Sequence, residues 1–164
     1  MNWPNQSTKE LNAFYGNPVG INGQANPKWK ATNLVLVPVP YHMIVAWEPH
    51  VPVKNILFHH KCAAPLARVL QGILDLYGSP AAIEKAGMHL YSGAYNYRAI
   101  RGSRRLSMHA YGCAIGLDSE HNPLVSRHGK MPKEVVKLFE AEGAEWGGRW
   151  RSRADPMHFQ WAKT

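Results

Sequence analysis

Apolar residues recur at helical spacing most clearly in HKCAAPLARVLQGILDLYG, residues 60–78. One face of this stretch carries Leu66, Val69, Leu70, Ile73, Leu74 and Tyr77. This period predicts an amphipathic helix that ends at Gly78, with Pro65 either in its first turn or at a kink.

Two further stretches carry helix start and stop signals. In STKELNAFYG, residues 7–16, Ser7 precedes Glu10 by three positions, which is a capping-box pattern, and Gly16 follows as a stop. In MPKEVVKLFEAEG, residues 131–143, a proline stands near the start and a glycine at the end. We therefore predict two shorter helices there.

The strand signals are short apolar or β-branched runs, separated by turn residues. They cover residues 33–40, 42–47, 88–98, 112–120 and 156–161, whereas the Gly-, Pro- and Asn-rich residues 17–33 indicate a loop. The order of elements predicts an α+β fold with helices packed on a small, mainly antiparallel sheet. We expect one domain over residues 1–164, with a helix-and-loop extension (1–32) and a core (33–164).

The formal net charge of +8 favours an anionic partner: nucleic acid, an anionic lipid surface or an acidic cell-wall polymer. The basic residues cluster in YRAIRGSRR (97–105) and GGRWRSR (147–153). These segments are either solvated loops or the rim of a cleft for an anionic substrate. No nucleic-acid-binding motif accompanies the charge, so we expect no nucleic-acid partner.

No apolar run approaches the roughly 18 residues of a membrane span, and the N-terminus lacks a secretion-signal pattern. We therefore expect synthesis in the cytoplasm. Cys62 and Cys113 are too few for a disulfide framework, and we expect two buried free thiols, with a single bridge as the alternative.

Two of the nine histidines have neighbours suited to metal chemistry. His109 stands between Ser107 and a strand, and His158 follows Asp155 by three residues. Catalytic zinc sites use three His, Asp or Glu ligands and keep one position open for water. A carboxylate beside that water serves as general base, and Asp155 is placed for this role.

The segments SMHAYGCAI and DPMHFQW together resemble a family of zinc peptidases. That family includes D-alanyl-D-alanine carboxypeptidases and phage L-alanyl-D-glutamate endopeptidases, with the motifs Ser-x-His-x-x-Gly-x-Ala-x-Asp and Glu/Asp-x-x-His. The matching residues are Ser107, His109, Gly112 and Ala114 in the first motif, and Asp155, His158 and Phe159 in the second. The resemblance runs from about residue 60 to the C-terminus.

The resemblance implies a fold of the Hedgehog/DD-peptidase type and a zinc cofactor on His109 and His158. It implies that Asp155 moves the proton of the attacking water. Arg98, or Arg101 if the turn is aligned differently, would stabilise the oxyanion or a substrate carboxylate, and Ser107 would bind the substrate backbone or orient a ligand. We expect Trp146, Tyr111 and Arg101 to contact substrate, although tryptophans near the second motif also suit a core.

The chain departs from the family at the end of the first motif, where Gly116 replaces the aspartate ligand. Asp118 substitutes for it in one outcome, although it lies about 6.6 Å further along a regular strand. In a second outcome, water or an anion completes the site. In a third, the site is empty, and Asp118 is a turn residue.

The leading hypothesis is an endolysin-like zinc peptidase that cuts D-amino-acid-containing stem peptides of peptidoglycan. The partners implied are the stem peptide and an anionic cell-wall or membrane surface, and we expect a monomer. The implied localisation is synthesis in the host cytoplasm, followed by action on periplasmic or cell-wall peptidoglycan after release. The alternative is a catalytically impaired wall-binding homologue, because of Gly116.

Overall fold

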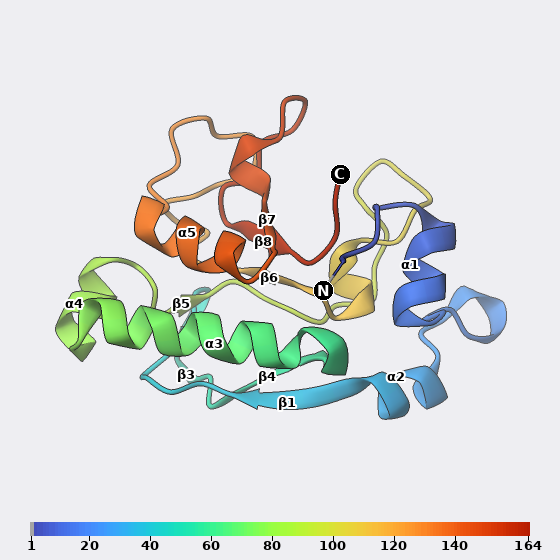
Figure 1. Cartoon of the computed structure of the whole chain (residues 1–164), viewed down its shortest axis with the longest axis horizontal. Coiled ribbons are helices and arrows are strands. Elements are labelled where there is room, and N and C mark those ends of the chain that lie inside the picture. Colours follow the sequence, from blue (N-terminus) through green and yellow to red (C-terminus); the bar gives the residue numbers. More distant parts are fainter. Residues whose placement is uncertain (1) are drawn as a thin grey trace.

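A computed structural model of the chain describes residues 2–164, in which helices and short strands follow one another in groups (Figure 1). The helices are α1 (Thr8–Tyr15), α2 (Pro27–Asn33), α3 (His60–Tyr77), α4 (Pro80–Lys85) and α5 (Lys133–Ala141). The strands are β1 (Leu34–Pro38), β2 (Ile44–Val45), β3 (Glu48–Pro52), β4 (Asn55–His59), β5 (Leu90–Tyr91), β6 (Ala114–Gly116), β7 (Glu145–Trp146) and β8 (His158–Gln160). The α+β prediction is confirmed.

The strands across residues 2–164 form three small sheets instead of the single sheet that we predicted. Their orders are β1–β4, β3–β2–β5 and β6–β8–β7. All pairs are antiparallel except β2–β5, so the mainly antiparallel character holds. The strands are shorter than the apolar runs suggested, because most of residues 88–98 and 112–120 lies outside regular pairing.

The three predicted helices are present, and their ends follow the expected signals. The Ser7 side chain accepts a hydrogen bond from the Glu10 amide, which caps α1. Gly78 takes a left-handed conformation (φ 69°) directly after α3. Pro65 lies inside α3, beyond its first turn, and is buried.

Two helices were missed. Helix α2 lies in residues 17–33, which we predicted to be a loop. The Asn26 side chain accepts hydrogen bonds from the Lys28 and Trp29 amides, and Pro27 begins the helix, so an Asn-Pro cap was the overlooked signal. Helix α4 starts in the same way, with a Ser79 cap followed by a proline.

The core surrounds α3, which lies between the β1–β4 sheet and α5 (Figure 1). Phe159 of β8 stacks on Phe139 of α5, with ring centroids 3.8 Å apart, and Trp161, directly after β8, is fully buried. Both cysteines are buried and unbridged, as expected. None of the described helices combines the length and apolar character needed to cross a bilayer.

Candidate active site

The two motif histidines lie on adjoining elements, and their positions follow from backbone pairing. His109 lies in a short 3-10 helix, Met108–Tyr111. The Ser107 side chain caps this helix by accepting a hydrogen bond from the His109 backbone amide. His158 begins β8 and pairs with Gly116 of β6 in an antiparallel register. Because β6 follows the 3-10 helix closely, this register brings the two histidines together.

The imidazoles face each other, although the residues are 49 positions apart. His109 Nε2 lies 3.2 Å from His158 Nδ1, and the ring planes cross at 74°. Both side chains are nearly buried, with relative exposures of 9% and 6%. The structure thus brings together the two histidines on which the metal-site hypothesis depends.

In each ring, the outer nitrogen is the one that points away from the other ring. It forms a hydrogen bond with an oxygen that can act only as an acceptor. His109 Nδ1 lies 2.6 Å from the Ala94 carbonyl oxygen, and His158 Nε2 lies 3.0 Å from Gln160 Oε1. Each outer nitrogen therefore carries the proton, and each facing nitrogen presents a lone pair. Burial lowers the pKa of His109 to about 4 and that of His158 to about 3, which keeps both rings neutral near pH 7.

Asp155 is the carboxylate of the site. Its Oδ1 is buried and has no hydrogen-bond partner among the described residues. Burial raises the pKa of Asp155 to about 6, while the charges of Arg153 and Arg98 oppose the shift. The backbones of Asp155 and Gly147 lie close together, because a β-carbon at Gly147 would lie only 2.6 Å from the Asp155 carbonyl oxygen. Only glycine therefore fits at this position.

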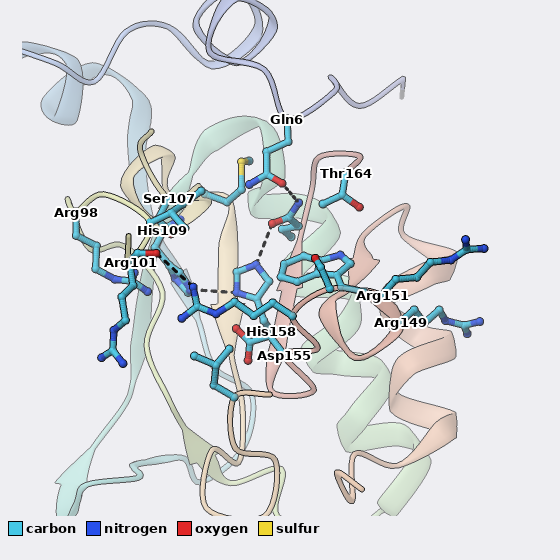
Figure 2. Close-up of a pocket in the computed structure, with 17 residues that line it drawn as sticks. Gln6, Arg98, Arg101, Ser107, His109, Arg149, Arg151, Asp155, His158 and Thr164 are labelled. Carbon is cyan, nitrogen blue, oxygen red and sulfur yellow. Dashed lines mark hydrogen bonds between the residues drawn. The ribbon is translucent and has the colours of Figure 1, made fainter. Parts of the chain in front are cut away.

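These residues line a cavity of about 730 Å³, into which their side chains project (Figure 2). Its walls include the predicted residues Arg98, Arg101, Ser107, His109, Asp155 and His158. Arg149, Arg151 and Arg153 also line the cavity, so the segment 147–153 forms a cationic rim. Against five arginines, Asp155 is the one side-chain carboxylate on the lining within residues 2–164. The cavity therefore favours anionic ligands.

Asp118 does not join the two imidazoles, so of the three outcomes that the sequence left open, the one in which Asp118 replaces the missing ligand is wrong. Strand β6 ends at Gly116, and Asp118 has a φ of 49°, so regular alternation along the strand breaks before it. Its carboxylate accepts hydrogen bonds from His121 Nδ1 (2.8 Å) and Asn122 Nδ2 (3.1 Å). Across residues 2–164, no group of three or more His, Cys, Asp or Glu side chains is placed to hold a metal.

The aromatic residues predicted to contact substrate lie outside the cavity lining. Tyr111 is buried and donates a hydrogen bond to Asn12 Oδ1, and Trp146 donates from its indole to the Pro156 carbonyl. Both side chains pack in or against the core. For the tryptophans, the sequence analysis had kept a core position as an alternative to substrate contact. Trp150 lines the cavity in their place, with its ring centroid 5.2 Å from that of His158.

Two glutamines of the cavity wall were not predicted. Gln160 lies two residues after His158 on β8, so strand alternation places both side chains on one face and could have identified it. Gln6 reaches the cavity from the N-terminal segment, and a parallel bridge between Asn5 and Lys163 holds that segment beside the chain's other end. No local pattern marks Gln6, because the contact spans 154 residues.

Gly116 stands where the resembled motif carries its aspartate. Gly116 lies opposite His158 in the β6–β8 pair, and it contributes no side chain. A β-carbon there would lie 3.3 Å from both Cβ and the carbonyl oxygen of Ser92, which is a tight but not prohibitive contact. Two imidazoles and one nearby carboxylate are therefore what the chain offers at this site.

Residues 101–161 match a family model described as D-alanyl-D-alanine carboxypeptidase, and the matched stretch contains His109, Asp155 and His158. Neither the search of curated proteins nor that of solved structures found a match to the chain. Over residues 101–161, which hold both motif histidines, the chain is thus similar to carboxypeptidases of this family, and the match suggests a peptidase for peptidoglycan-type substrates.

Proposed function

We propose that the protein is a zinc-dependent peptidase that hydrolyses stem peptides of peptidoglycan. The observation that carries the proposal is the pair of lone pairs facing each other across 3.2 Å. Two such lone pairs repel, and a cation between them removes the repulsion. Two nitrogens bound to one tetrahedral zinc at 2.0–2.1 Å lie about 3.3–3.4 Å apart, so the observed spacing fits this ion.

The residues around the imidazoles suit hydrolysis. Zinc held by His109 and His158 would supply Lewis-acid chemistry at the scissile carbonyl. Asp155 takes up the proton of the attacking water through its unpartnered Oδ1 and returns it to the leaving amine. Arg98 stabilises the negative charge on the oxyanion, since its own charge already acts on both rings and on Asp155.

The charge of the cavity supports an acidic peptide as substrate. Stem peptides carry free carboxylates, and Arg101, Arg151 and Arg153 offer guanidinium groups on the wall. The net charge of +8 further supports binding to an anionic wall or membrane surface. Within this proposal the protein is an endolysin-like monomer, made in the cytoplasm of a host and acting on the wall after release.

A second function is favoured by Gly116. With only two protein ligands the site binds zinc weakly, because losing even an outer partner of a ligand costs about 10–100-fold in affinity. A protein that keeps the cationic cavity but lacks metal would bind wall peptides without cutting them. The second candidate is therefore a wall-binding homologue with impaired catalysis.

The test measures the zinc content of the protein and its hydrolysis of purified peptidoglycan. Hydrolysis is monitored through the amino groups released and through mass spectrometry of the products. The peptidase proposal predicts bound zinc and cleavage, both lost in His158→Ala and both kept in His50→Ala, which alters an exposed histidine on β3. A metal-free, inactive protein that still co-sediments with walls would establish the second function. A protein that neither cuts nor binds walls would overturn both.

A further inference from the structure

Gln160 is the buried amide that holds His158 from behind. Its side chain is 1% exposed, and its Oε1 lies 3.0 Å from His158 Nε2, on the side of the ring away from His109. The contacts form a row of side chains from Gln6 through Gln160 and His158 to His109. Figure 2 labels Gln6, His158 and His109 of this row. Because Oε1 only accepts, His158 must donate its proton there.

The orientation of this amide is set by the backbone. Gln160 Nε2 donates to the Ala162 carbonyl oxygen at 3.2 Å and to Gln6 Oε1 at 3.3 Å. If the amide turned over, its oxygen would face the Ala162 carbonyl, and two acceptors would meet in a buried place. Such a contact leaves two buried polar groups unsatisfied, which is unfavourable. The Gln160 oxygen therefore stays directed at His158.

In the competing tautomer of His158, the two imidazoles would form a hydrogen bond with each other. If the proton moved to Nδ1, that nitrogen would donate to His109 Nε2, whose lone pair is fixed by the bond from His109 Nδ1 to the Ala94 carbonyl. The two imidazoles would then satisfy each other, and neither facing nitrogen would be free for a metal. A neutral imidazole in this pocket therefore needs a partner that selects the open tautomer.

We infer that Gln160 is a positioning residue that holds His158 in the tautomer with its lone pair on Nδ1. The inference deepens the proposed function and rests on it for the metal, although the tautomer itself is a property of the metal-free protein. In this role Gln160 acts through His158 and does not touch the reacting atoms. Its removal lowers zinc affinity by about 10–100-fold, as for other outer partners of metal-binding histidines.

The test uses the full-length, metal-free, ¹⁵N-labelled protein, since long-range ¹⁵N–¹H spectra report which ring nitrogen carries the proton. We expect the proton on Nε2 of His158 in the wild type and in Gln160→Glu, which keeps the acceptor. In Gln160→Met, a side chain of similar size without an acceptor, we expect it on Nδ1. Gln6→Met is the matched control: the Ala162 carbonyl still orients the amide, so the tautomer stays unchanged.

Zinc titration of the same four proteins gives the second readout. Gln160→Met weakens zinc binding by about 10–100-fold, and Gln160→Glu does not weaken it. A proton on Nδ1 in the wild type, or an unchanged tautomer in Gln160→Met, would overturn the inference. If Gln160→Met does not fold, the wild type and Gln160→Glu still decide the tautomer. Failure of every protein to bind zinc would remove the proposed function, whereas a Gln160-dependent tautomer would still uphold the positioning role.

Discussion

Gly116→Asp places a carboxylate opposite His158, at the third ligand position. Cross-strand partners in an antiparallel pair project to the same face, so the new side chain lies on the face of His158. The backbone of Gly116 is extended and admits a β-carbon without strain. The cost comes from Ser92, whose Cβ and carbonyl oxygen lie 3.3 Å from that β-carbon and must move by a few tenths of an ångström.

The magnitudes favour a gain for the metal-bound protein. Crowding of this kind costs about 1–3 kcal/mol, and about 0.5–1 kcal/mol of it is offset because glycine itself weakens a strand. The metal-free variant is therefore less stable than the wild type by up to about 2.5 kcal/mol. A third ligand strengthens zinc binding by more than about 100-fold, which corresponds to roughly 2.8 kcal/mol. With zinc present at saturation, the variant becomes the more stable protein.

Zinc affinity is measured by competition with a chelator, and stability by thermal unfolding with and without zinc. Two controls separate charge from shape. Gly116→Asn adds the same volume without the carboxylate, and Asp118→Asn neutralises the carboxylate that contacts His121 and Asn122. We expect wild-type zinc affinity in Asp118→Asn and only a small change in Gly116→Asn. Equal zinc affinity in Gly116→Asp and Gly116→Asn would refute the reasoning.

Three further predictions follow from the site and the core. Asp155→Asn lowers the rate of peptidoglycan cleavage by about 10²–10⁴-fold and leaves zinc content unchanged, and cleavage at the wild-type rate would remove Asp155 as the base. Arg101→Gln and Arg151→Gln each weaken co-sedimentation with walls by about two- to fivefold and reduce its salt dependence, whereas Lys85→Gln on α4 changes neither. Burial lowers the pKa of His59 to about 4, so this ring is neutral in the fold but binds a proton on unfolding below about pH 6.5. The free energy of unfolding therefore falls as pH is lowered from about 6.5 towards 4, by at most about 1.4 kcal/mol per pH unit. Urea unfolding at pH 7 and pH 5 should show a smaller loss of stability in His59→Gln than in the wild type. Equal losses in the two proteins would count against a buried neutral ring.

The features predicted correctly from the sequence are those that local patterns and side-chain chemistry determine. The apolar face of residues 60–78 anticipated α3, and two motifs pointed to histidines whose facing nitrogens lie 3.2 Å apart. Helices α2 and α4 were overlooked because their signal is a cap followed by a proline, within segments that otherwise suit loops. Strands β3 and β4 were also overlooked, in a stretch for which we predicted no element.

The rest depends on contacts that no local window contains. Asp118 turned away from the site because the chain leaves the extended conformation after Gly116, and a count of positions assumes a regular strand. Trp146 and Trp150 are four residues apart, but a short 3-10 turn sends one indole to the core and the other to the cavity. Gln6 reaches Gln160 only because both ends of the described chain pair with each other.

The bridge between Asn5 and Lys163 makes the cavity depend on the segment that precedes α1. A protease that removes the residues before α1 would take away Gln6, one residue of the cavity wall, and leave both histidines in the chain. A limited-digestion time course would then show wall binding decaying sooner than the helical signal of the protein.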